Sequence, residues 1–208
     1  MKPSLSKTFI YVNLIHYPVH VLGPGDRAGL WTQGCTIRCP GCVAAYTWEF
    51  SGEYKMKVKE AADKILSFGS GRLTVSGGEP FDQPAAFNEL LLLLRKGGIE
   101  DIMVYSGYPY ERLKKLYSSA LDKIDALVDS PFVEGAYSNE KWRGSNNQNM
   151  IILSEKKQLR EKYMSYMADA SAEAGRALQV ASCGGKVYVI GIPDQRDVSG
   201  IKSGLGSI

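Results

Sequence analysis

The stretch GCTIRCPGCVAAYTW, from Gly34 to Trp48, holds three of the four cysteines of the chain. Three residues separate Cys35 from Cys39, and two separate Cys39 from Cys42. The N-terminal segment, MKPSLSKTFIYVNLI, lacks the long apolar run and the small-residue cleavage site of a secretory signal, so we expect a cytoplasmic protein. In that compartment clustered thiols indicate metal or redox chemistry before disulfide formation.

Three closely spaced thiolates are compatible with several kinds of site. Structural zinc takes four protein ligands, and His16 or His20 would complete a Cys3His set. A disulfide with one spare thiol is a second alternative. A four-iron cluster with only three protein ligands is the third, and it would leave one iron open for a small molecule.

Length and composition favour one globular domain over residues 1–208. The chain is 44% hydrophobic, which is ordinary for a protein with a buried core, and its net charge is only +3. That charge does not indicate a nucleic-acid partner. The longest apolar run, Leu90–Leu94, lies inside an amphipathic pattern, so we expect no membrane partner either.

Apolar strand-like runs alternate with helical periodicity along the chain. This alternation favours a mainly parallel sheet with helices outside it, and the number of units predicts an open partial (β/α)6-type barrel within the α/β class. We expect a core over about 17–153, a C-terminal helix and strand over 154–192 and a frayed tail over 193–208. The expected strands are 8–15, 28–34, 72–78, 101–107, 124–130, 149–153 and 186–192; the expected helices are 54–68, 84–98, 109–120 and 154–178, the last with Ser154 as N-cap.

Polar residues follow several of the predicted strands. Gly77–Glu79, Ser106–Gly107 and Asp129 each come directly after one. Chemistry in parallel sheets is found at the carboxyl ends of the strands, so we expect these residues to share a site. The polar segment 130–149 predicts a surface loop that is either functional or mobile.

Two motifs together resemble the radical S-adenosylmethionine superfamily. The first is the C-x3-C-x2-C spacing of Cys35, Cys39 and Cys42, and the second is VSGGEP at Val75–Pro80. Further stretches resemble the activating enzymes of glycyl-radical proteins, above all those of anaerobic ribonucleotide reductase. They are GPGDRAGLWTQGCTIRCPGC, YSGYPYERL, LVDSPF and RGSNNQ, and the resemblance runs from about Tyr17 to Leu153.

The resemblance implies a [4Fe-4S] cluster held by Cys35, Cys39 and Cys42, whose open iron is chelated by the amino and carboxylate groups of S-adenosyl-L-methionine. It implies an electron from a flavodoxin or ferredoxin and reductive cleavage of that cofactor to a 5′-deoxyadenosyl radical. The radical would remove a hydrogen from a backbone glycine of a glycyl-radical partner protein. Within this oxidoreductase chemistry the protein supplies binding, orientation and exclusion of water.

The resemblance also implies the cofactor contacts. Gly77 and Gly78 would let the backbone approach the cofactor, and Glu79 would accept hydrogen bonds from its amino group. Ser106 and Gly107 match a cofactor-contacting motif, and Asp129 matches an acid near the methionine end or a monovalent cation. Asn147 and Gln148 match a polar loop motif without an assigned role.

Some residues depart from the family pattern or carry plainer interpretations. Val43 and Ala44 stand where the close family has an aromatic residue and an asparagine, and the chain extends past the reductase activators. The alternative is therefore a radical enzyme that modifies a peptide or a small molecule. A non-catalytic zinc or iron–sulfur module is a third hypothesis, which leaves GGEP unexplained. We interpret Cys183 as a buried or idle thiol, and Arg27 as a residue that orients the cysteine loop or makes an ion pair.

Overall fold

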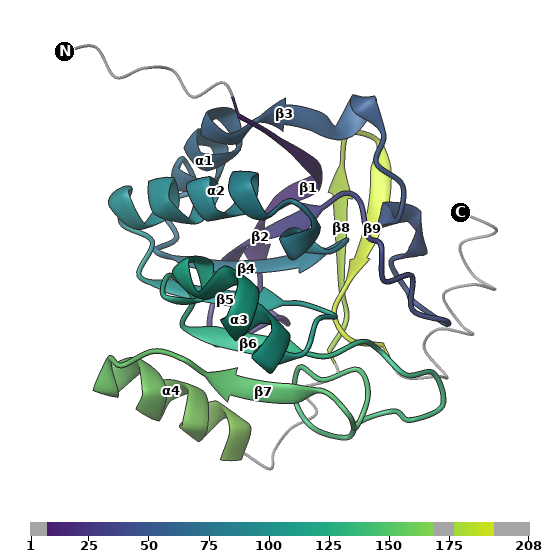
Figure 1. Cartoon of the computed structure of the whole chain (residues 1–208), viewed down its shortest axis with the longest axis vertical. Coiled ribbons are helices and arrows are strands. Elements are labelled where there is room, and N and C mark those ends of the chain that lie inside the picture. Colours follow the sequence, from purple (N-terminus) through teal and green to yellow (C-terminus); the bar gives the residue numbers. More distant parts are fainter. Residues whose placement is uncertain (1–7, 169–176, 194–208) are drawn as a thin grey trace.

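A seven-stranded sheet forms the centre of the computed structural model, which describes residues 8–168 and 177–193 (Figure 1). The strands lie in the order β3-β1-β2-β4-β5-β6-β7. Strands β2, β4, β5 and β6 run parallel, whereas β1, β3 and β7 pair antiparallel at the two margins. The bounds are β1 Phe9–Val19, β2 Arg27–Thr32, β3 Lys55–Lys57, β4 Arg72–Gly77, β5 Asp101–Tyr105, β6 Ala126–Asp129 and β7 Asn149–Ile152. The mixed α/β class with a parallel centre is confirmed, and the described strands form an open sheet.

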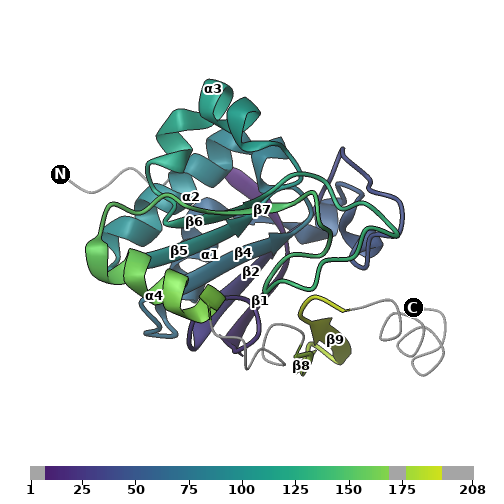
Figure 2. The ribbon, with the colours of Figure 1, turned by 90° about the horizontal axis from the view of Figure 1, so that it is seen from below.

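Three helices cover one face of this sheet (Figure 2). They are α1 Val58–Leu66, α2 Pro84–Lys96 and α3 Tyr110–Leu121, and each precedes a parallel strand. Helix α2 begins at Pro84, which has no N–H to satisfy, and ends before Gly97. Its buried leucines Leu90, Leu91 and Leu94 join the largest apolar core, between the helices and the sheet. Three short 3-10 helices lie near the strand ends: η1 Ala45–Thr47, η2 Gly52–Tyr54 and η3 Pro80–Asp82.

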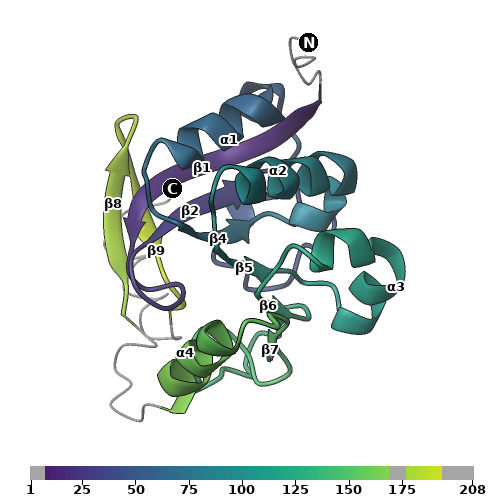
Figure 3. The same cartoon turned by 90° about the vertical axis from the view of Figure 1, so that its left-hand side faces the viewer.

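The C-terminal part of the chain covers the opposite face. Helix α4, Lys157–Ala168, and the hairpin of β8 Gln179–Cys183 and β9 Lys186–Ile190 lie there (Figure 3). Ala181 and Ile190 of the hairpin share a buried cluster with Leu14, Val19 and Trp31. Tyr163 of α4 shares another with Met103, Ala126, Val128 and Trp142. Both faces of the sheet are therefore packed.

Three sequence expectations need correction. The helix expected over 54–68 begins only at Val58, because Lys55–Lys57 pairs with β1 as β3. The helix expected over 154–178 begins at Lys157, residues 177–178 are not helical, and 169–176 lie outside the described residues. Strand β8 was not expected, and β9 pairs with it instead of joining the main sheet. Of the expected tail, 194–208 also lies outside the described residues.

The hydroxyl of Ser154 accepts a hydrogen bond from the backbone N–H of Lys156 at 3.4 Å, and Lys156 precedes α4. Ser154 therefore stands too early to be the N-cap of α4. Within the described residues, no helix is both long enough and apolar enough to cross a bilayer.

A buried ion pair joins the starts of the parallel strands. Arg27, which is 0% exposed, donates to Asp101 through Nη1 to Oδ2 at 2.6 Å and through Nη2 to Oδ1 at 3.0 Å. Its Nε donates to Thr74 Oγ1 at 2.8 Å, and Tyr163 Oη donates to Asp101 Oδ1 at 2.7 Å. Burial alone would raise the pKa of Asp101, but the hydrogen bonds and charge of Arg27 hold it below its ordinary value. The ion-pair interpretation of Arg27 is confirmed.

Replacing Arg27 by methionine should lower the free energy of unfolding by about 3–5 kcal/mol, because Asp101 would remain buried with its charge uncompensated. Urea unfolding followed by circular dichroism measures the change. The matched control is Lys59→Met, which breaks an exposed pair with Asp63 and should cost about 1 kcal/mol or less. Equal and small losses in the two variants would show that the buried pair does not hold the sheet together.

Candidate functional site

The three clustered cysteines lie on the loop that follows β2. All three are free thiols of intermediate exposure. The loop is anchored by backbone hydrogen bonds from Gly34 N to Thr47 O at 2.7 Å and from Cys35 N to Trp48 O at 2.9 Å. It lies at the end toward which the parallel strands point, beside the long loop after β6 (Figure 2). The sheet therefore presents the thiols at the carboxyl ends of its strands.

The GGEP turn at the end of β4 is in direct backbone contact with the cysteine loop. Gly78 N donates to Thr32 O at 2.8 Å, and Glu79 N donates to Gly34 O at 2.8 Å. Gly77 has a φ of +94°, and a Cβ on Gly78 would lie 2.3 Å from Gly34 O. Glycine is required here because the two motifs touch each other. The expected close approach of this backbone to a cofactor stays a prediction.

Glu79 is the centre of a buried hydrogen-bond network, with only 1% of its surface exposed. Its Oε1 accepts from Ser106 Oγ at 2.9 Å and from Phe81 N at 3.0 Å, and its Oε2 accepts from Gly107 N at 2.8 Å. Burial raises the pKa of Glu79 to about 7, although these donors oppose the rise. The structure thus brings Gly77–Glu79 and Ser106–Gly107 together, with the carboxylate between them.

Asp129 belongs to the next strand end and is 3% exposed. Its Oδ2 accepts from Tyr110 N at 2.7 Å, and its Oδ1 accepts from Asn149 N at 3.1 Å and Asn149 Nδ2 at 2.9 Å. In this arrangement the carboxylate joins the start of α3 to β7. Its expected role toward the cofactor or a cation stays a prediction.

The loop over 130–149 is held by its own side chains. Gln148 Oε1 accepts from Gly144 N at 2.8 Å, Gln148 Nε2 donates to Ser130 O at 3.1 Å, and Asn147 Nδ2 donates to Pro131 O at 2.8 Å. The loop reaches the cysteines, since a Cβ on Gly41 would lie 2.7 Å from the Glu134 carboxylate. Asn147 and Gln148 therefore shape the wall beside the thiols.

Three further residues hold the cysteine loop and were not singled out from the sequence. Asp82 Oδ2 accepts from Thr36 N at 2.6 Å, and Asp82 Oδ1 accepts from Tyr108 Oη at 2.6 Å. Asp82 thus ties the loop between Cys35 and Cys39 to η3 and to the loop after β5. The only sequence signal was its position three residues after Glu79, in the first turn of a helix.

The donor set fits an iron–sulfur cluster better than a single zinc ion. Within the described residues, no three His, Cys, Asp or Glu side chains converge on one metal-ion position. His16 pairs with Gly29 of β2 and His20 bonds to Asp26 before the start of β2, whereas Cys35 follows the end of that strand. In a four-iron cluster each thiolate binds its own iron, so the sulfurs need not converge on one point. Burial raises the pKa of Cys35 and of Cys39, so iron binding must displace protons from these thiols.

The raised pKa of Glu79 predicts a pH-dependent stability. Between about pH 4.5 and pH 7 the folded chain binds a proton that the unfolded chain releases, so the free energy of unfolding should fall as pH rises through this window. Urea midpoints of the metal-free chain measure the slope, and Glu79→Gln should flatten it. The glutamine amide would place a donor against Gly107 N–H and so lower the absolute stability at every pH. The quantity to compare is therefore the slope of stability against pH. An unchanged slope in the variant would contradict the prediction.

Comparisons with known proteins agree with this site. The profile of the 4Fe-4S single cluster domain family matches residues 21–151. The anaerobic ribonucleoside-triphosphate reductase-activating protein of Vibrio cholerae is 34% identical over 145 residues, which cover 64% of this chain and 92% of that protein. Its counterpart in Escherichia coli (strain K12) is 34% identical over 146 residues, covering 64% and 93%. That of Enterobacteria phage T4 is 30% identical over 136 residues, covering 62% and 86%.

Among solved structures, that of QueE from Escherichia coli overlaps 56% of this chain and 68% of its own, with a TM-score of 0.42 and 16% identity, which is too distant to add to the assignment. The chain belongs to the 4Fe-4S single cluster domain family, and to the activating proteins of anaerobic ribonucleoside-triphosphate reductase.

Proposed function

We propose that this chain is a radical S-adenosylmethionine enzyme that activates a glycyl-radical protein of the anaerobic ribonucleotide reductase kind. The observation that carries the proposal is the backbone contact between the three-cysteine loop and the GGEP turn at the carboxyl ends of the parallel strands. The relatives named for this activity support it, because the chain matches more than nine-tenths of the length of two of them. We also propose that the sheet is a partial barrel of the (β/α)6 type.

In this proposal Cys35, Cys39 and Cys42 hold a [4Fe-4S] cluster. The residues Gly77, Gly78, Glu79, Ser106, Gly107 and Asp129 line the place of S-adenosyl-L-methionine. The reduced cluster would supply the electron that cleaves S-adenosyl-L-methionine to methionine and a 5′-deoxyadenosyl radical, and this radical would remove a hydrogen atom. The chain itself fixes the position of the thiols through Asp82 and Gly34, and excludes water from the Glu79 network by burial.

The surface around the cysteines supports a protein substrate. Val43, directly after Cys42, and Tyr46, in η1, are 55% and 53% exposed, and Val133 on the neighbouring loop is 43% exposed. Exposed apolar side chains gathered on adjoining loops are typical of protein interaction sites. A glycine-bearing loop of the partner would approach the cofactor over this surface. Of the alternatives, a small-molecule substrate gives no reason for exposed apolar groups outside the site, whereas a peptide substrate would also contact them.

We propose a flavodoxin or ferredoxin as the source of the electron, because the half-exposed thiols leave the cluster within reach of a docked protein. We also propose that the protein works in the cytoplasm, where thiols remain reduced and available to iron.

Cysteine variants test the radical chemistry. The anaerobically reconstituted chain, reduced with dithionite and given S-adenosyl-L-methionine, should release 5′-deoxyadenosine. Cys35→Ala, Cys39→Ala and Cys42→Ala should each lose at least a hundredfold in rate, because each thiolate holds one iron. Cys183→Ala is the matched control and should keep the activity, since Cys183 packs against the hairpin cluster. No product from a wild-type chain that purifies with zinc would leave a structural metal module.

A second test addresses the partner. The reduced enzyme is mixed with the anaerobic ribonucleotide reductase of the same organism, and glycyl radical is counted by electron paramagnetic resonance. Val133→Asp should lower radical yield at least tenfold while 5′-deoxyadenosine formed without partner stays unchanged. Leu116→Asp is the control, because this exposed leucine lies on α3, away from the cysteine loop. Product without any radical on the reductase would favour the peptide or small-molecule alternative.

A further inference from the structure

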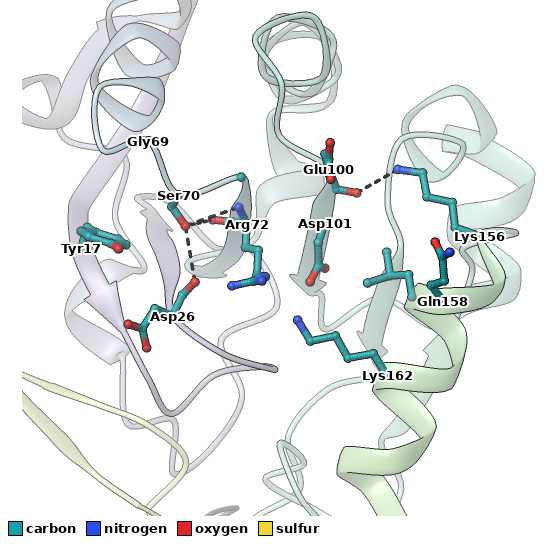
Figure 4. A pocket seen from close by; sticks show the side chains of 12 residues that line it. Tyr17, Asp26, Gly69, Ser70, Arg72, Glu100, Asp101, Lys156, Gln158 and Lys162 are labelled. Carbon is teal, nitrogen blue, oxygen red and sulfur yellow. Dashed lines mark hydrogen bonds between the residues drawn. The ribbon is translucent and has the colours of Figure 1, made fainter.

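A cavity lies at the end of the sheet opposite the cysteine loop, where the parallel strands begin. It has a volume of about 650 Å³ and is lined by the loop Gly69–Gly71, by the starts of β4 and β5, and by α4. Arg72, Lys156 and Lys162 point into or across it (Figure 4). The cysteine loop follows the opposite end of β2, so this cavity is separate from the proposed radical site.

Two cationic side chains, Arg72 and Lys162, lie on facing sides of this cavity. Figure 4 shows the guanidinium of Arg72 and the ammonium of Lys162 pointing toward each other. Both heads reach the Gly25 turn, where a Cβ would lie 3.3 Å from Arg72 Nη1 and 4.0 Å from Lys162 Nζ. Burial, and next the charge of Arg72, lower the pKa of Lys162. The two like charges repel each other, and an anion bound between them would lower that repulsion.

Three acidic residues, Asp26, Glu100 and Asp101, also line the cavity, and the charge of Asp101 partly offsets the lowering of the Lys162 pKa. Asp101 is already bonded to Arg27 and Tyr163, and Asp26 Oδ1 lies 2.7 Å from His20 Nδ1. Among residues 8–168 and 177–193, no carboxylate forms an ion pair with Arg72 or Lys162. Lys156 adds a third cation at the far wall, where its Nζ donates to the backbone oxygen of Glu100 at 3.1 Å.

We propose that this cavity binds a phosphate group, either inorganic phosphate or the phosphate of a small organic molecule, between Arg72 and Lys162. A guanidinium fork and a mobile ammonium are the two side chains that proteins use most for phosphate. The cavity has the volume of a small-molecule site and exceeds what inorganic phosphate fills. Tyr17 lies on the wall opposite α4, where it would face an organic part of the ligand.

One wall of this cavity is formed by residues outside the part of the chain that matches the iron–sulfur family. Lys156 and Lys162 both lie beyond residues 21–151, which match the iron–sulfur family. Arg72 lies within that match, at the first position of β4. The cation pair therefore needs both β4 and the segment beyond residue 151. Binding at this pair does not involve the cluster ligands.

Calorimetric titration of the full reconstituted chain tests the proposal, with the cluster oxidised and saturating S-adenosyl-L-methionine present to occupy its own site. The probes are sodium phosphate, ATP and adenosine. We expect phosphate or ATP to bind, and Arg72→Gln and Lys162→Gln each to weaken that binding at least tenfold. Lys115→Gln, an exposed lysine of α3 outside the cavity, should leave it unchanged. Tighter binding of ATP than of phosphate would identify the organic source, and the reverse would identify the inorganic one.

The proposal is overturned if neither phosphate nor ATP binds at millimolar concentration, if both glutamine variants bind like the wild type, or if adenosine binds as tightly as ATP. Lys162→Arg, which keeps the charge, should bind within about threefold of the wild type. Thermal unfolding without ligand and 5′-deoxyadenosine formation show that the variants are folded, because neither Arg72 nor Lys162 belongs to the radical site.

Discussion

One buried carboxylate holds three segments together at the carboxyl ends of the parallel strands. Glu79 accepts hydrogen bonds from η3 and from the loop after β5, while its own backbone N–H donates to the loop that carries the cysteines. A buried carboxylate is tolerated only when its oxygens are satisfied, and here three donors surround it. The cysteine loop, η3 and the loop after β5 are therefore held in one fixed arrangement around Glu79. The thiols and the strand-end glycines are held in position by the chain itself.

The opposite end of the strands has a different task. There Arg27, Asp101 and Tyr163 form a buried group that joins β2, β5 and α4. The carboxyl ends of the strands thus carry the loops with the thiols, and the amino ends carry the buried ion pair that fixes the strands. Such a division is known from other parallel α/β folds, where the carboxyl ends carry chemistry and the amino ends carry stability. The cation pair of Arg72 and Lys162 lies beside the stabilising group, and it does not take part in that group's hydrogen bonds.

The sequence predicted best those features that depend on local pattern. Helix α2 was predicted over 84–98 and is found over Pro84–Lys96, because proline, leucine periodicity and glycine all indicate the same helix. The proximity of Cys35 and Glu79 followed from the rule that parallel strand ends meet. Strand β3 and the β8–β9 hairpin were not predicted from the sequence. Strand formation depends on the partner strand, as when Lys55–Lys57 pairs with β1. The role of Asp82 was not predicted because its hydrogen-bond partners, Thr36 and Tyr108, are far from it in sequence.

The hairpin over residues 179–190 has a consequence for the order in which the protein is made. It covers Leu14, Val19 and Trp31, which belong to the first two strands. During translation these strands leave the ribosome long before the hairpin does, so an apolar face of the sheet is open to water and to other chains for most of synthesis. Nascent chains in that condition are prone to aggregate or to be held by chaperones. The apolar cluster around Leu14, Val19 and Trp31 is therefore closed only after the hairpin has been made.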